Sequence, residues 1–166
     1  MNFLNYFKES KNLFFKKENF LHLAIIFIIF FLDRISKIGI INNFSNTSIY
    51  INDFINLNLI WNIGVGFGFF STELSFFYNF MTLLIATIIT ILLIIFFKSN
   101  KFDKLIYAII IGGALGNLCD RLVYKAVPDF IDLHYNNFHW FTFNVADIFI
   151  SIGIIIFIIR SFFIKN

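Results

Sequence analysis

Residues 112–147 read GGALGNLCDRLVYKAVPDFIDLHYNNFHWFTFNVAD. Three small residues at helical spacing, Gly112, Gly113 and Gly116, lead directly into the polar residues of this stretch. Apolar runs long enough to cross a bilayer lie on both sides of it. A carboxylate at the end of a membrane span is a candidate functional residue, because desolvating it is costly. The polar residues of the stretch are Asn117, Asp120, Arg121, Asp129, Asn144 and Asp147.

The composition indicates an integral membrane protein. Of 166 residues, 59% are hydrophobic and 14% are charged, whereas a soluble domain carries roughly a quarter of charged residues. No Pro-rich or Gly/Ser-rich linker divides the chain, so we expect a single membrane domain over residues 1–166. The chain has one cysteine, which excludes an intrachain disulfide. We expect membrane lipid as a partner and no nucleic acid.

Four apolar runs predict four transmembrane helices, at about 20–41, 76–97, 105–122 and 144–163. Residues 1–19 are polar and basic and are expected to form a cytoplasmic segment. Residues 123–142 are expected to form a second outer segment, in which Asp132 is a solvated loop residue. In the outer segment 44–70, apolar residues alternate in part with Asn, most clearly in NLNLIWN, which predicts short strands on the membrane surface. The fold class is therefore an all-α membrane protein with a small β element between spans 1 and 2.

The distribution of basic residues predicts the orientation. Nine of the thirteen Lys and Arg residues lie in the N-terminal segment, the 98–104 loop and the C-terminal end. The opposite side has only Lys125 and the span-edge Arg121. Because Lys and Arg favour the cytoplasmic side, both termini are expected to be cytoplasmic.

A depth estimate brings the polar residues of the spans to one layer. A helix rises about 1.5 Å per residue, so Asp33 and Asp120 lie roughly 20–25 Å from the inner ends of spans 1 and 3. Asp147 lies in the first turn of span 4, at the same outer boundary. The layer is expected to hold Asp33, Lys37, Asn62, Asn117, Asp120, Arg121, Asp129, Asn144 and Asp147.

Glycine and charge spacing suggest how these residues are held. Gly64, Gly66 and Gly68 alternate with apolar residues, which indicates a tight backbone path or a close approach to a ligand. Asp33 and Lys37 are spaced i, i+4 and can neutralise each other as an ion pair. Small residues four apart allow close helix packing. Gly112, Gly116 and Asp120 share one face of this helix, and Gly113, Asn117 and Arg121 share the adjacent one. This arrangement favours a role for Asp120 and Arg121 in shaping the site over a direct role in catalysis.

Two carboxylates, Asp129 and Asp147, offer chemistry at a dry membrane edge. Each also has a plain interpretation: Asp129 as a turn residue, and Asp147 as a charge that stabilises a helix N-terminus. If they converge, like charges resist ionising together and one proton is shared. The ionised member can then take a proton from water while the neutral member protonates a scissile carbonyl. This chemistry needs no metal and no cofactor, and the sequence contains no metal-binding motif.

Five ordered blocks resemble the lipoprotein signal peptidase family, also called signal peptidase II. They are DRISK (33–37), NIGVGF (62–67), GGALGNLCDR (112–121), VPDFI (127–131) and FNVAD (143–147). The resemblance covers all four expected spans and leaves residues 1–19 outside. It implies a multi-pass aspartic endopeptidase of the bacterial inner membrane, with its active site at the periplasmic face. The implied substrates are prolipoproteins lipidated on a cysteine.

The resemblance also implies residue roles. Asp129 and Asp147 match the catalytic pair, and Asp120 matches a structural acid. A periplasmic β-cradle and helix would correspond to parts of 44–75, and a globomycin-type inhibitor would occupy the cleft of what we expect to be a monomer. Supporting or substrate-binding positions are Asp33, Lys37, Asn62, Gly64, Asn117, Arg121 and Asn144. Two departures from the pattern are Pro128, where Val is usual, and Gly66, where Ala is usual.

Two other hypotheses remain open at this point. A small polytopic transporter or proton-conducting subunit could use Asp33, Asp120 and Asp147 as a relay, which predicts at least one acid near the midplane. A non-catalytic assembly protein could use the same residues only to hold its helices together.

Overall fold

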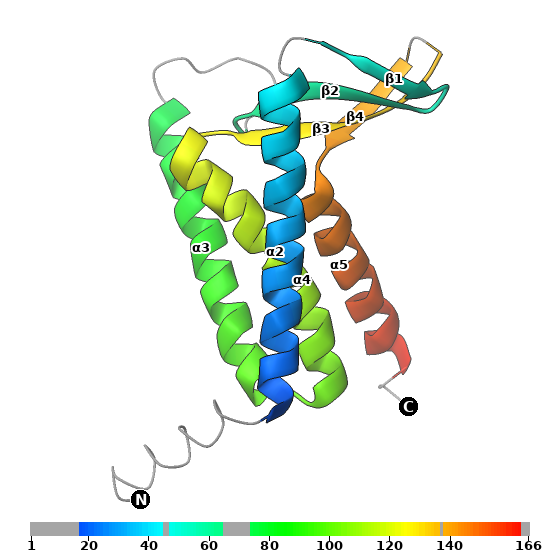
Figure 1. Cartoon of the computed structure of the whole chain (residues 1–166). Helices are drawn as coiled ribbons and strands as arrows, with labels where there is room; N and C mark the ends of the chain where they lie inside the picture. Colours follow the sequence, from blue (N-terminus) through cyan, green and yellow to red (C-terminus); the bar gives the residue numbers. More distant parts are fainter. Residues whose placement is uncertain (1–16, 45–46, 65–73, 137, 164–166) are drawn as a thin grey trace, which may run out of the picture.

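The computed structural model describes residues 17–44, 47–64, 74–136 and 138–163. Figure 1 shows helices packed side by side with a small sheet across one end. The helices are α2 (Lys17–Phe44), α3 (Leu74–Lys98), α4 (Lys101–Tyr124) and α5 (Val145–Phe163). The strands are β1 (Ile49–Asn52), β2 (Ile55–Asn62), β3 (Val127–Tyr135) and β4 (Phe138–Phe143). The start of α2 and the end of α5 lie at the end opposite the sheet.

Helix α4 is the centre of the bundle, and it contacts α2, α3 and α5. Its side chains Ala108 and Ile111 are fully buried against Ile26 of α2 and against Ile89 and Phe96 of α3. Asn100 begins the helix, since its side-chain oxygen accepts the backbone N–H groups of residues 102 and 103. The helix ends at Lys125, whose left-handed backbone (φ 58°) turns the chain into β3.

The sheet is antiparallel with the order β1-β2-β3-β4. Strands β2 and β3 are neighbours although α3 and α4 separate them in sequence. The predicted strands between the first two spans are thus confirmed as β1 and β2, but they are only half of the sheet. The other half, β3 and β4, comes from residues 127–143, for which the sequence predicted an outer segment and no strands. The sheet therefore ties both outer segments together above the helices.

Pro128 does not interrupt the sheet. It lies within β3 and pairs with Trp61 of β2. Strand β4 pairs with β3 only from Ile131 onward, so β3 has a free edge at Pro128. Proline is tolerated at such an edge because no ladder hydrogen bond is needed there.

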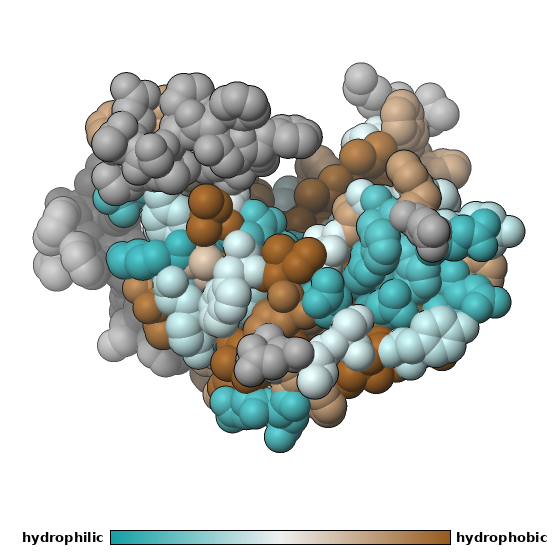
Figure 2. Space-filling model, turned by 90° about the horizontal axis from the view of Figure 1, so that it is seen from above, coloured by the Kyte–Doolittle hydropathy of each residue, from teal (hydrophilic) through white to brown (hydrophobic). Residues whose placement is uncertain are grey.

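Within the described residues, three helices are long and apolar enough to cross a membrane: Phe76–Lys98, Lys101–Tyr124 and Val145–Phe163. Many large apolar side chains on α3 and α5 are exposed, as expected for surfaces that face lipid rather than water. The view onto the sheet end in Figure 2 differs, because hydrophilic residues gather over part of that face. These features support a multi-pass membrane protein. Residues 1–16 and the glycines at 66 and 68, on which several expectations rest, lie outside the described residues.

Candidate active site

Asp129 lies in β3, and its side chain accepts two amide hydrogen bonds. The Nδ2 group of Asn62 donates to its Oδ2 over 2.8 Å, and Nδ2 of Asn144 donates to its Oδ1 over 2.6 Å. Asn62 pairs in register with Val127, which places the two side chains diagonally on one face of the sheet. Asn144 lies near Asp129 because β4 ends opposite Ile131, two residues after Asp129 in β3. Asp129 is 4% exposed, so it is a buried strand residue and not a turn residue.

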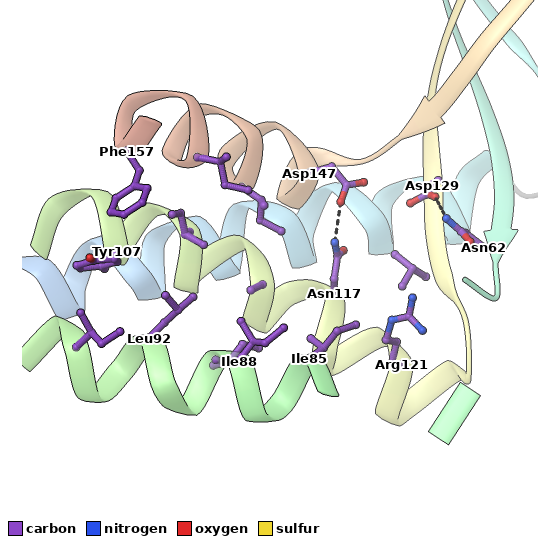
Figure 3. Close-up of a pocket in the computed structure, with 17 residues that line it drawn as sticks. Asn62, Ile85, Ile88, Leu92, Tyr107, Asn117, Arg121, Asp129, Asp147 and Phe157 are labelled. Atoms are coloured by element: carbon purple, nitrogen blue, oxygen red, sulfur yellow. Dashed lines mark hydrogen bonds between the residues drawn. The ribbon is translucent and has the colours of Figure 1, made fainter. Parts of the chain in front are cut away.

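Asp147 lies in the first turn of α5 and also accepts two hydrogen bonds. Its Oδ1 accepts from Nδ2 of Asn117 over 2.8 Å, and its Oδ2 accepts from the backbone N–H of Asn144 over 3.2 Å. In return, the backbone N–H of Asp147 donates to the Asn144 side-chain oxygen over 3.1 Å. Asn144 therefore contacts both acids, and Figure 3 shows Asp129 and Asp147 at the same end of the pocket that they line.

A group of four charges, of which only Arg34 is partly exposed, lies between α2 and α4 and contacts the backbone of Ala146 at the start of α5. The Lys37 ammonium donates to Asp33 over 2.9 Å and to Asp120 over 2.7 Å. Arg34 pairs with Asp120 and, over 3.3 Å, with Asp33. The sequence predicted the pair Asp33–Lys37, but it did not predict that Asp120 is the second acid of the same group. Two positive and two negative charges balance, which offsets the cost of burying them.

Glycines on α4 give the charged group and α5 room to approach. A Cβ at Gly116 would lie 2.3 Å from Oδ2 of Asp33, and a Cβ at Gly113 would lie 2.6 Å from the backbone oxygen of Ala146. The two glycine-bearing faces therefore meet different helices: one meets α2, and the other meets the start of α5. This is the close packing that the four-residue spacing predicts.

Arg121 lies at the sheet end of α4, against Gly64 and Tyr78. Its guanidinium is 5.3 Å from the Tyr78 ring centroid, and the Tyr78 hydroxyl donates to its backbone oxygen over 2.9 Å. Gly64 has a left-handed backbone (φ 76°), and a Cβ there would lie 2.7 Å from a guanidinium nitrogen. Only glycine meets both conditions without strain.

A cavity of about 550 Å³ opens beside these residues. Its polar end is formed by Asn62, Asn117, Arg121, Asp129 and Asp147. The remaining wall is apolar and runs between α3, α4 and α5 as far as Phe157 and Tyr107 (Figure 3). An apolar cleft with a few convergent polar groups is the usual form of a ligand site.

Burial raises the pKa of the Asp129 carboxyl above its ordinary value, and the nearby charge of Asp147 raises it further. The hydrogen bonds from Asn62 and Asn144 act in the opposite direction, because they stabilise the carboxylate. This pKa is thus coupled to a second acid in the same site, as in a pair that shares a proton.

Arg34 and Tyr78 are site-supporting residues that the sequence analysis did not single out. Arg34 follows Asp33 directly, but nothing in the sequence indicates a partner on α4. Tyr78 lies in an apolar run that gives no sign of a contact with Arg121. Asp132, expected as a solvated loop residue, is instead buried in β3 and bonds His139 Nδ1 over 2.7 Å. In the described part of the chain, no group of three or more His, Cys, Asp or Glu could hold a metal ion.

The sequence model of the family described as signal peptidase (SPase) II matches residues 25–163. The chain belongs to this family. The lipoprotein signal peptidase of Pelagibacter ubique is 46% identical to it over 153 residues, covering 90% of this chain and 92% of the relative. That of Thermodesulfovibrio yellowstonii is 42% identical over 137 residues, covering 82% and 90%.

Solved structures of bacterial membrane enzymes share the fold of this chain. Two structures, each described as that of a bacterial membrane enzyme, align with TM-scores of 0.72 and 0.71 at 28% and 27% identity. They cover 85% and 88% of this chain, and 92% and 90% of their own. The chain is an enzyme of the peptidase class, and the predicted family is confirmed. The transporter and assembly hypotheses gain no support.

Proposed function

We propose that this chain is an aspartic endopeptidase that removes signal peptides from prolipoproteins whose cysteine carries a diacylglyceryl group. The observation that carries the proposal is that Asn144 forms a hydrogen bond with each of the two acids. One residue bonds the Asp129 carboxylate through its side chain and the Asp147 carboxylate through its backbone N–H. Two acids held by one residue at the polar end of an apolar cavity suit peptide hydrolysis beside a lipid phase.

The reaction uses a water molecule bound between Asp129 and Asp147. The ionised acid takes one proton from water, and the oxygen of that water attacks the scissile carbonyl carbon. The neutral acid gives its proton to the carbonyl oxygen, which produces a neutral tetrahedral diol. The C–N bond then breaks, and the leaving amine takes the proton that came from water. One diol hydroxyl returns its proton to the other acid, so the pair ends in its starting state with one shared proton.

The apolar wall of the cavity suits the hydrophobic parts of this substrate. From Asp147 to Phe157 the wall follows α5 for ten residues, or about 15 Å. That length accommodates apolar side chains of a signal segment or part of an acyl chain. At the polar end, Arg121 would hold a backbone carbonyl group of the substrate.

The charge distribution supports a topology for the enzyme. Helix α2, with 28 residues, would be a fourth membrane span beside α3, α4 and α5. Among the described residues, five basic side chains lie at the end of the bundle away from the sheet and favour a cytoplasmic location for that end: Lys17, Lys98, Lys101, Lys104 and Arg160. The sheet and the two acids would then lie at the periplasmic face of the inner membrane. A globomycin-type inhibitor is expected to occupy the same cavity, and a monomer is expected to suffice for activity.

A purified, vesicle-reconstituted enzyme tests this function directly. The substrate is a prolipoprotein carrying diacylglyceryl on its cysteine, and the matched control is the same polypeptide without the lipid. We expect cleavage immediately before the lipidated cysteine, identified by the mass of the products, and much slower cleavage of the unlipidated form. Protein carrying Asp147→Asn serves as the blank for contaminating proteases.

Two results would overturn the proposal. The first is intact lipidated substrate in the presence of folded enzyme. The second is equal cleavage of both substrates, which would show that the enzyme does not recognise the lipid. Proton or ion flux into the same vesicles would instead revive the transporter hypothesis.

A further inference from the structure

Lys37 is a buried ammonium whose three hydrogen-bond partners are all acceptors. It is fully buried in α2 and donates to Asp33 over 2.9 Å, to Asp120 over 2.7 Å and to the Asn117 side-chain oxygen over 2.8 Å. An ammonium carries three donors and no acceptor, so this set uses it completely. The first two contacts balance charge, whereas the third contacts a neutral amide that also faces Asp147.

The contact with Lys37 fixes which end of the Asn117 amide faces Asp147. Because Lys37 can only donate, the group facing it must be the amide oxygen. The NH₂ group then points to Oδ1 of Asp147, 2.8 Å away. Without the ammonium, the amide could turn over and present its oxygen to Asp147, where it could bond only a protonated acid.

Fixed donors also orient the two amides that face Asp129. The Gly64 N–H donates to the Asn62 oxygen over 2.7 Å, and the Asp147 N–H donates to the Asn144 oxygen over 3.1 Å. Both NH₂ groups are therefore directed at Asp129. All three amides are oriented by a group that cannot accept, but only Asn117 is oriented by a full positive charge.

The two acids differ in what stabilises their charge. Asp147 lies at the N-terminus of α5, where the helix dipole favours an anion, and its amide donor is polarised by Lys37. Asp129 is more deeply buried, and both of its donors are neutral side-chain amides. The charge of Lys37 also lowers the pKa of Asp129, but it is the smallest of the influences on that pKa. The charged groups around the pair are Asp33, Arg34 and Lys37 of α2, Asp120 and Arg121 of α4, and the two acids themselves.

We propose that Lys37 is a positioning residue that acts through Asn117. It keeps the NH₂ group of the Asn117 amide directed at Asp147. Asp147 is then the ionised acid that takes the proton from water, and Asp129 carries the shared proton. The inference rests on the proposed function and names the role of each acid within it. The buried charges of α2 then contribute to hydrolysis as well as to the stability of the fold.

The test compares Asp120→Asn with the charge-balanced pair Lys37→Met/Asp120→Asn. Both variants lack the acid, but only the second loses the donor to Asn117. For the double variant we expect kcat to fall about 10- to 100-fold relative to Asp120→Asn, the range seen when a group that orients a catalytic side chain is lost. KM should stay within about twofold, since Lys37 does not line the cavity.

The pH–rate profile gives the decisive readout. If Lys37 holds the Asn117 NH₂ group on the acid that takes the proton from water, its loss should move the acidic limb of kcat to higher pH in the double variant. In Asp120→Asn alone the extra positive charge should leave that limb in place or move it to lower pH. A double variant whose acidic limb coincides with that of Asp120→Asn would overturn the inference.

Asn117→Leu provides a second variant that leaves all four charges of the group in place, in case the double variant or Asp120→Asn, which leaves one positive charge unbalanced, does not fold. It should shift the acidic limb in the same direction, and a folded Asn117→Leu protein with the wild-type limb would also overturn the inference. Failure of the proposed function looks different, because the wild-type enzyme would then not cleave lipidated prolipoprotein at all.

Discussion

The carboxylate of Asp33 in α2 accepts a hydrogen bond from the backbone N–H of Ala146 over 3.0 Å, across 113 residues of sequence. Ala146 directly precedes Asp147, so a buried acid on one helix fixes the first turn of another. The same carboxylate bonds Lys37 through its second oxygen. Asp33 therefore links the buried charges to the backbone that presents Asp147.

Replacing Asp33 should destabilise the protein strongly. In Asp33→Asn, Lys37 and Arg34 keep their charges but only Asp120 remains to balance them. Leaving a buried charge uncompensated costs about 3–5 kcal/mol. The free energy of unfolding in bicelles measures this. Asp53→Asn, an exposed acid bonded to Tyr50, should change stability by less than about 0.5 kcal/mol; equal stability of the two variants would contradict the account.

Adding a methyl group at Gly116 should be far more harmful than adding one at Gly39. The Cβ of Gly116→Ala would lie 2.3 Å from the Asp33 carboxylate, so the charged group must move. We expect a loss of about 1–3 kcal/mol, as for other overpacked sites, together with reduced activity. Gly39→Ala meets nothing within 4 Å and should be neutral or slightly stabilising. Thermal unfolding of both variants checks the difference, and equal transitions would refute it.

The sequence predicted the family and the small-residue packing because both depend on local spacing. Gly112 and Gly116 share a helical face whatever the tertiary fold, and that face does pack on α2, against Ile29 and Asp33. The five sequence blocks predicted the family in the same way, from local motifs, and the comparisons confirm that prediction. Membrane character followed from apolar runs such as residues 76–97.

The pairing across helices could not be predicted, because it depends on rotation about each helix axis. Lys37 contacts Asn117, 80 residues away, and nothing in DRISK specifies that partner. Strands β3 and β4 were missed because acids and aromatic residues obscure the alternation in 127–143. For the same reason Asp132 was taken for a solvated residue. The roles of Asp129 and Asp147 in catalysis remain predictions.

Loss of the Asn62 amide should move the basic limb of the pH–rate profile to higher pH. The hydrogen bond from Asn62 lowers the pKa of Asp129, so Asn62→Leu raises that pKa and Asp129 keeps its proton over a wider range. Activity should also fall, since one support of the acid is lost. Asn58→Leu, at an exposed position of the same strand, should leave the profile unchanged. A basic limb that moves to lower pH in Asn62→Leu would contradict the assigned proton.

Tyr78 should support Arg121 mainly through its ring. Tyr78→Phe removes the hydroxyl bond to the Arg121 backbone oxygen and should cost about 0.5–1.5 kcal/mol of stability, with KM little changed. Tyr78→Ala also removes the ring beneath the guanidinium and should raise KM several-fold, because Arg121 loses its fixed position. Kinetics with the lipidated substrate separate the two effects. A KM for Tyr78→Ala equal to that of Tyr78→Phe would exclude a role of the ring.

The most direct test of the paired acids is the initial rate of prolipoprotein cleavage by Asp129→Asn and by Asp147→Asn, each measured beside wild type and beside Asp132→Asn. Asp132 is a buried acid of the same strand on the opposite face of the sheet, so its variant controls for the loss of a buried carboxylate. Each dyad variant should fold and lose at least about 10²–10⁴-fold in kcat, whereas Asp132→Asn should keep most of its activity. A wild-type rate in either dyad variant would contradict the claim that two acids act together on one water molecule.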